Sequence, residues 1–156
     1  MKPVENPNII IDATNAILGR LASFAAKQAL LGKTIAIVNC NDAVVSGRRA
    51  NILKEYQIAR ARGGSIMKGP NFPHIPERLV KRTIRGMLKY KQQRGADALD
   101  RVICYNKLPK EYESSKKTSL EMRKEIKAKT IKLSELGKLI WRDLKRQLYL
   151  EREKQQ

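Results

Sequence analysis

The stretch that decides the fold is NIIIDATNAILGRLASFAAKQALLGKTIAIVNC, residues 8–40. It opens with an apolar run at residues 8–14 that ends in polar residues, which is typical of a short buried strand. Apolar residues then recur at helical spacing between Asn15, the expected N-cap, and Gly32, the expected C-terminal stop. A second apolar run follows at residues 33–40. This order predicts a βαβ unit, with two parallel strands covered by a helix.

The chain continues in the same α/β pattern. A helix is expected over residues 48–62, and residues 65–76 are rich in Pro and Gly, which predicts an ordered loop. Pro76 is placed to begin another helix, because proline is accepted in a first helical turn, and we expect this helix to include residues 77–94. A further apolar run at residues 101–105 indicates another strand.

The length of 156 residues suits one domain over residues 1–156 with a core of ordinary size. We expect the core at about residues 8–109. Residues 110–130 are polar and mixed in charge, so we expect them to be exposed and partly irregular. The basic segment at residues 131–156 predicts a C-terminal helix, with Ser134 as its cap.

The location and the cofactors of the protein are constrained by what the sequence lacks. No apolar run approaches the ~20 residues that cross a bilayer, and no secretory signal is visible, so we expect a cytoplasmic protein without a membrane partner. Cys40 and Cys104 lie in apolar runs and are expected to be buried, reduced thiols. His74 is the only histidine. Two distant cysteines and one histidine do not form a zinc site, and we expect neither a metal nor a cofactor.

The positive charge is concentrated in the middle of the chain. The net charge is +18, from 33 Lys and Arg against 15 Asp and Glu. Residues 46–94 contain thirteen of the bases and two of the acids. A charge of this size predicts an anionic partner: nucleic acid, a membrane surface or an acidic protein.

The helix expected over ERLVKRTIRGMLKYKQQR, residues 77–94, has two faces. Five cations fall within about a third of its circumference at 100° per residue: Arg78, Lys81, Arg82, Arg85 and Lys89. The opposite side is expected to pack on the core: Val80, Thr83, Ile84 and Met87. Gly86 lies between the faces, where it can admit the backbone of RNA or of another protein.

Like charges spaced four apart repel each other on a helix. A solvated helix face usually mixes both signs, whereas this one is almost wholly cationic. A bound polyanion removes the repulsion and releases counterions, and the arginine fork suits phosphate. The cationic face therefore predicts a polyanion-binding surface.

Three functions fit these features: structural RNA binding, a DNA-binding module, and a small α/β enzyme acting on a phosphorylated substrate. The sequence has neither of the common glycine-rich phosphate-binding motifs, and no nucleophile can be paired with a base. The VSGRR turn at residues 45–49 offers only a weak anion site. No helix-turn-helix, zinc finger or zipper is present, and the cations are spread over several segments. RNA binding through phosphate and sugar is therefore the favoured function, and no small-molecule substrate is expected.

An ordered set of segments then resembles the large-subunit ribosomal protein thirteen family, in its archaeal and eukaryotic form. The segments are Asp12-Ala13, LGRLA at 18–22, LGK at 31–33, VVSG at 44–47, GPNFPHIPER at 69–78 and RTIRGMLKYKQQRGADALDRVICYNKLP at 82–109. The resemblance implies a three-layer α/β/α fold around a mainly parallel four-stranded sheet, with a basic C-terminal helical extension. It also implies binding to large-subunit ribosomal RNA beside neighbouring ribosomal proteins, support of subunit assembly and translation, and no catalytic activity.

The candidate RNA-binding residues come from two sources. Family position implies RNA contact at four arginines: Arg20, Arg48, Arg85 and Arg94. Charge alone nominates the others: Arg49, Arg60, Arg62, Lys68, Arg78, Lys81, Arg82, Lys89 and Lys91.

Overall fold

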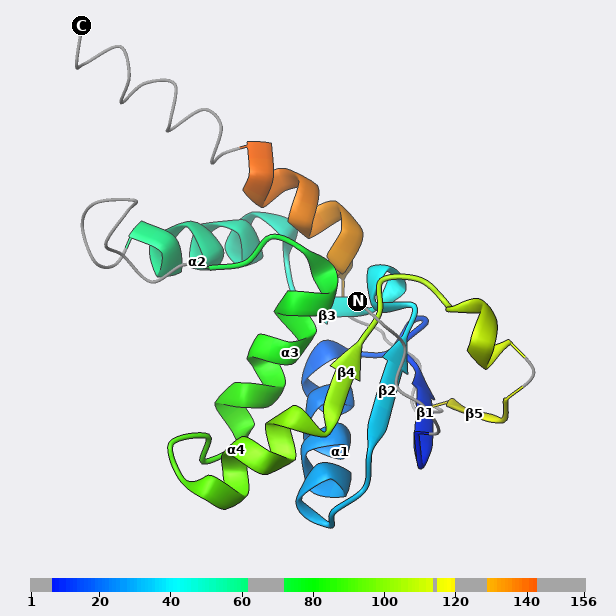
Figure 1. Ribbon diagram of the computed structural model, residues 1–156. Coiled ribbons are helices and arrows are strands. Elements are labelled where there is room, and N and C mark those ends of the chain that lie inside the picture. The colour runs from blue at the N-terminus through cyan, green and yellow to red at the C-terminus, as the bar shows by residue number, and fades with distance from the viewer. Residues whose placement is uncertain (1–6, 62–71, 114, 120–128, 143–156) are drawn as a thin grey trace, which may run out of the picture.

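The main sheet is parallel and four-stranded, and the α-helices up to residue 100 lie to one side of it (Figure 1). The computed structural model describes residues 7–61, 72–113, 115–119 and 129–142 of the chain. The strands are β1 (Ile9–Asp12), β2 (Ile35–Val38), β4 (Val102–Cys104) and β5 (Lys117–Ser119), in the order β4-β2-β1-β5. Every neighbouring pair is parallel, which confirms the predicted α/β class and sheet.

The predicted βαβ unit is formed by β1, α1 (Leu18–Leu30) and β2. Gly32 ends α1 as predicted: its φ is +87°, its N–H donates to Ala29 O (3.0 Å), and the Lys33 N–H donates to Gln28 O (3.3 Å). This pair of bonds is a Schellman motif, which favours glycine at the left-handed position.

The prediction that Asn15 caps α1 is wrong. The helix begins at Leu18, after Ile17, which provides no side-chain cap. Asn15 instead has a φ of 57°, within a turn that leads to Ala16, whose carbonyl accepts from the Val44 N–H at 2.9 Å. The residues before α1 are therefore held by pairing with a neighbouring strand, which the local sequence pattern does not show.

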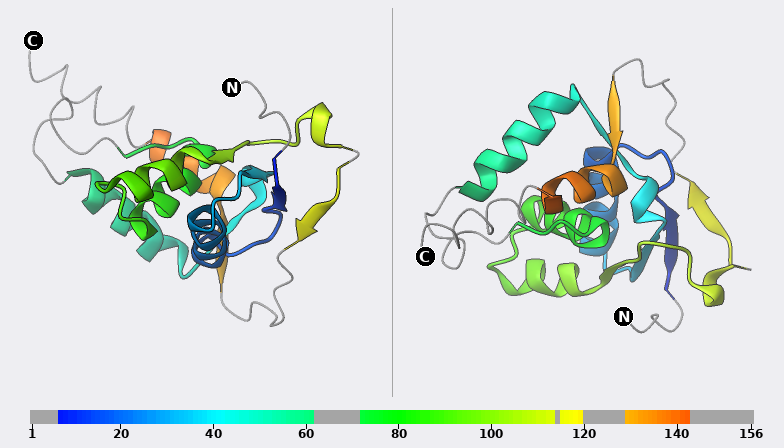
Figure 2. Two further views of the ribbon diagram at one scale, coloured as in Figure 1. Left: turned by 60° about the horizontal axis from the view of Figure 1, so that its bottom comes forward. Right: turned by 90° about the horizontal axis from the view of Figure 1, so that it is seen from above.

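The two faces of the sheet are covered differently, as Figure 2 shows. Ile11, Ile35 and Ile37 belong to the larger core, which includes the buried sides of α1 and of helices later in the chain. Alternate strand residues, such as Ile10 and Val38, join a smaller cluster on the other face. This smaller cluster includes Tyr105, at the end of β4, and Tyr112 of the 3-10 helix η2 (Lys110–Tyr112).

The fourth strand lies in a segment for which the sequence indicated no strand. β5 pairs with β1 through Lys117–Ser119. Its three residues show no apolar run, because the strand lies at the sheet edge and Thr118 is exposed. The strand is therefore fixed by backbone pairing, and its side-chain pattern gives no signal.

A second, two-stranded antiparallel sheet joins β3 (Val44–Ser46) to β6 (Thr130–Lys132). β3 leads into α2 (Arg49–Ala61), and β6 leads directly into a helix at residues 133–142. The predicted C-terminal helix is present over residues 133–142, where Leu136, Leu139 and Ile140 are buried as expected, and residues 143–156 lie outside the described part of the chain. Ser134 is not its cap, because the helix already includes residue 133.

The helix expected to include residues 77–94 is two helices, α3 (Pro76–Met87) and α4 (Gln93–Asp100). Pro76 begins α3 as predicted. Leu88 then adopts an extended conformation and is buried, so the chain leaves the helix to place this side chain in the core. The following residues, KYKQQR, contain no aliphatic side chain that could anchor a longer α3.

Cys40 and Cys104 are both buried in the larger core, as predicted. A hydrogen bond with Cys104 and then burial raise the pKa of the Cys40 thiol. The thiol form of Cys40 is therefore favoured, and both cysteines pack as small core side chains.

A hydrogen-bonded carboxylate at the end of β1 makes the stability depend on pH. The Asp12 Oδ1 accepts from the Thr14 hydroxyl (2.7 Å), the Thr14 N–H (3.0 Å) and the Asn39 amide (3.1 Å). Burial raises the pKa of Asp12, but these bonds together with the charge of Lys117 outweigh it, and the pKa lies below its usual value. A lowered folded-state pKa stabilises the protein above the unfolded value, and this contribution is lost as the pH falls through the folded value.

We therefore expect Asp12→Asn to flatten the pH dependence of the unfolding free energy below about pH 4, where the unfolded chain takes up a proton on Asp12 before the native carboxylate does. Denaturant unfolding measured at several pH values between 2 and 6 checks this. A slope equal in the two proteins would show that Asp12 does not contribute.

Candidate nucleic-acid interface

Helix α3 separates its apolar and cationic side chains. Leu79, Val80 and Ile84 are buried in the larger core, with exposed fractions of 2% or less. The buried side holds α3 against α1 and β4. The cations are therefore presented by a helix whose other side is fixed, and their relative positions are set by the helix geometry.

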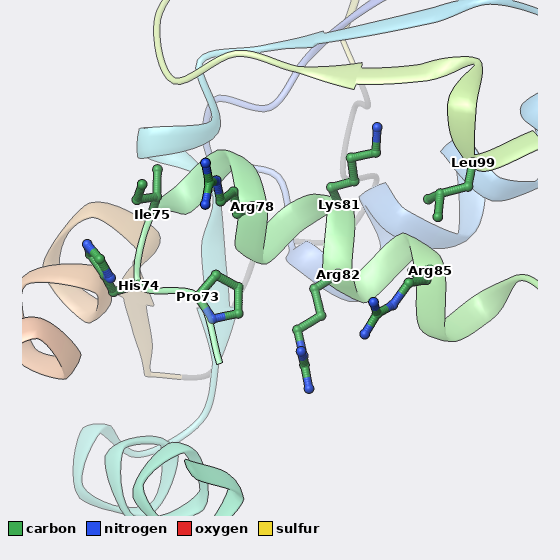
Figure 3. Close-up of a pocket in the computed structure, with 8 residues that line it drawn as sticks. All are labelled: Pro73, His74, Ile75, Arg78, Lys81, Arg82, Arg85 and Leu99. Carbon is green, nitrogen blue, oxygen red and sulfur yellow. The ribbon is translucent and has the colours of Figure 1, made fainter. Parts of the chain in front are cut away.

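Four of the five cations predicted to share one face line a single pocket (Figure 3). They are Arg78, Lys81, Arg82 and Arg85. The pocket has a volume of about 460 Å³, and its remaining walls are Pro73, His74, Ile75 and Leu99. In Figure 3, Arg78 and Lys81 point to one side of α3, and Arg82 points to the side on which α2 lies.

Two details of the predicted faces are wrong. Lys89 is not on α3, since the helix ends at Met87. Met87 was expected on the core side, but 45% of its surface is exposed, because the core position is taken by Leu88. Thr83 is partly buried, and its hydroxyl donates to Leu79 O at 3.0 Å within the helix.

Lys89 and Lys91 lie in the turn between α3 and α4, and Arg94 is in the first turn of α4; all three are exposed. The turn is tight: the Gln92 N–H donates to Lys89 O at 2.9 Å. A Cβ at Gly95 would overlap the backbone carbonyl of Lys89. Residues 95–99, GADAL, thus hold α4 close to the turn. Lys89, Lys91 and Arg94 therefore extend the row of cations beyond the end of α3.

The cations lie close to one another and have few acidic partners. Within the described residues, no ion pair joins Arg78, Lys81 or Arg85 to an acid. Burial and then the charge of Arg85 lower the pKa of Arg82. Protein folding therefore brings these like charges together at a cost, and a bound anion would offset it.

Aromatic rings hold two of the arginines, and no pattern in the sequence pointed to these rings. The Arg82 guanidinium carbon lies 3.9 Å from the centre of the Phe72 ring, and the Arg85 carbon lies 5.1 Å from the Tyr90 ring. Phe72 in turn contacts Tyr56 of α2 edge to face, with ring centres 5.4 Å apart. These contacts join different segments, so no helical spacing in the sequence could indicate them.

The C-terminal helix supports the loop that forms one wall of the pocket. The rings of Trp141 and His74 are stacked with centres 4.6 Å apart. A Cβ at Gly137 would overlap the carbonyl oxygen of His74, so the helix and the loop are in close backbone contact. At the base of α3, the Asn106 side-chain oxygen accepts from the Glu77 N–H at 3.0 Å.

The other candidate residues lie outside this pocket. Arg20, in the first turn of α1, and Arg48, just before α2, are both exposed. Arg49 forms an ion pair with Glu135 of the C-terminal helix, at 3.0 Å. Arg60 belongs to α2, but its side chain is not described, and Arg62 and Lys68 lie outside the described residues.

The pocket presents cationic groups of the kind that bind phosphate. In the described part of the chain, no three His, Cys, Asp or Glu residues are grouped so that they could hold a metal ion. Over the same residues, no helix is long and apolar enough to cross a membrane. His74 stacks on Trp141, and no carboxylate lines the pocket.

Comparison with known proteins gives a consistent match over the described core. The family model of ribosomal protein L13 matches residues 7–111. Large ribosomal subunit protein uL13 of Methanosarcina barkeri is 47% identical over 132 residues, which cover 82% of this chain and 94% of the relative. The proteins of the same name from Methanococcoides burtonii and Picrophilus torridus are 45% and 39% identical, over 72% and 85% of this chain and 80% and 96% of the relatives.

Proposed function

Because the chain belongs to the ribosomal protein L13 family, we propose that it is a structural constituent of the large ribosomal subunit that binds the RNA of that subunit. The named relatives are themselves large-subunit proteins. The protein would act in the cytoplasm, beside neighbouring ribosomal proteins, and support subunit assembly and translation. It would act by positioning RNA and not as an enzyme.

One observation carries the RNA-binding part of this proposal: Arg78, Lys81, Arg82 and Arg85 line one pocket on a helix fixed by its apolar side. Phosphate contacts by such groups position an RNA backbone without reading its sequence. Several RNA segments held by one rigid domain also repel each other less, because the cations neutralise their phosphates. This accounts for a surface that carries so little negative charge.

The candidate residues differ in the part that we expect them to play in RNA contact. The four pocket cations and the exposed Lys89, Lys91 and Arg94 form the main contact surface. Arg20 and Arg48 contact separate RNA segments. Arg49 must leave or share its ion pair with Glu135 to contact RNA, and the assignments of Arg60, Arg62 and Lys68 rest on charge alone.

The test is the affinity of the purified protein for large-subunit ribosomal RNA fragments and for random duplex DNA, measured over a series of salt concentrations. We expect preferential binding to at least one ribosomal fragment. If four phosphates are neutralised, the slope of log affinity against log salt should be about −3 to −4. Equal affinity for both nucleic acids over the whole series would contradict specific ribosomal RNA binding.

A further inference from the structure

We propose that the pocket beside α3 receives one unpaired nucleotide of the RNA. This proposal rests on the proposed function. Its phosphate would lie among the cations of α3, and its base would pack against the apolar walls. The RNA facing α3 would then contain a bulge, loop or junction, and not only continuous duplex.

The size of the pocket is the first reason. Contact with a duplex backbone needs cations on an open surface, and it needs no cavity. This site has a volume of about 460 Å³, within the range of about 300–1,000 Å³ that is usual for pockets binding small organic groups. A phosphate alone would leave most of this space unfilled.

The chemistry of the walls is the second reason. Pro73 and Ile75 lie at one end of the pocket in Figure 3 and Leu99 lies at the other, with the cations between them. A ligand that matches both parts has an anionic group and a flat apolar group. A nucleotide has both, whereas a phosphate of a stacked duplex offers only the first.

The form of RNA is the third reason. In an A-form helix the bases are paired, and the deep, narrow major groove keeps their edges from side chains. Proteins therefore recognise bases mainly where loops and bulges turn them outward, and they pack them against aromatic rings or guanidinium planes. The Arg82 guanidinium, held against Phe72 at 3.9 Å, provides such a plane at the pocket.

Five RNA duplexes test this proposal. One is blunt and fully paired, and the other four are identical to it except for a single bulged nucleotide, which carries a different base in each. We expect at least one bulged duplex to bind the full-length protein about tenfold more tightly than the blunt one, an effect typical of one base contact. Equal affinity for the blunt duplex and all four bulged duplexes would overturn the pocket proposal. Retained binding to ribosomal RNA fragments in that case would leave the proposed function intact.

Variants that fill the pocket test whether the preference for a bulged duplex arises there. Ile75→Trp and, separately, Leu99→Trp fill opposite ends of the pocket without changing any charge, and each should lower the affinity for the bulged duplex to that for the blunt duplex measured with the same variant. Leu31→Trp is the matched control, since Leu31 is 65% exposed and does not line the pocket. A bulge preference that survives in both folded pocket variants would contradict the proposal.

A free nucleotide also has a phosphate and a base, so it is the alternative ligand of this pocket. Excess nucleoside monophosphate should not displace the bulged duplex, because it lacks the flanking phosphates that contact the other cations. Displacement at concentrations that leave blunt-duplex binding intact would reassign the pocket to a free nucleotide.

Discussion

Replacing both Arg78 and Lys81 with glutamate is expected to lower the affinity for large-subunit ribosomal RNA by on the order of 100-fold. Both side chains line the pocket, and neither forms an ion pair within the described residues. Two charge-assisted phosphate contacts at about 1.5 kcal/mol each account for about this factor. The slope of log affinity against log salt should also become shallower by about 2.

The thermal melt of the same double variant should be nearly unchanged, because the apolar side of α3 is untouched and Arg78 is exposed. A matched control, Lys107→Glu with Lys116→Glu, changes the net charge equally at two exposed positions that do not line the pocket. The control should retain most of the RNA affinity. If RNA affinity falls by the same factor in both double variants, the total charge of the protein determines binding, and the pocket cations have no special role.

The substitution Gly95→Ala is expected to destabilise the protein by about 2 kcal/mol, because an added methyl group overpacks the α3–α4 turn. The new Cβ would overlap the Lys89 carbonyl and approach the Tyr90 nitrogen to 3.0 Å. The usual helix preference for alanine, about 1 kcal/mol, offsets only part of this cost. Thermal unfolding should show a midpoint about 4–8 °C lower. Since the overlap displaces the turn that holds Lys89 and Lys91, RNA affinity should fall as well.

Gly86→Ala is the matched control, because it makes the same change in a helix where nothing lies within 4 Å of the new Cβ. Its stability should rise by up to about 1 kcal/mol. If RNA backbone approaches closely at Gly86, this variant should bind RNA more weakly while being more stable. A loss of stability equal to that of Gly95→Ala would show that the turn contact is not the cause.

The sequence predicted those parts of the fold that are encoded by local periodicity. The βαβ unit, the apolar positions Val80 and Ile84 of α3 and the buried side of the C-terminal helix follow from strand or helix spacing. It also placed four cations together, because their spacing on one helix fixes their direction.

The parts that the sequence did not predict depend on contacts between distant segments. β5 is held at the sheet edge by backbone pairing with β1, so its side chains need no pattern. The end of α3 depends on the burial of Leu88 and the close contact at Gly95. The aromatic partners of Arg82 and Arg85 come from a loop and a turn, which no single periodic element contains.

The most direct test of the central claim is the reactivity of individual lysines towards an acylating reagent, with and without bound large-subunit ribosomal RNA. If RNA binds the main contact surface, it should protect Lys81, Lys89 and Lys91, while the exposed Lys107 and Lys116 remain reactive. Mass spectrometry of digested protein reports each site separately in the same sample. Protection of Lys107 and Lys116, with Lys81, Lys89 and Lys91 left as reactive as in the unbound protein, would place the RNA elsewhere and contradict the account.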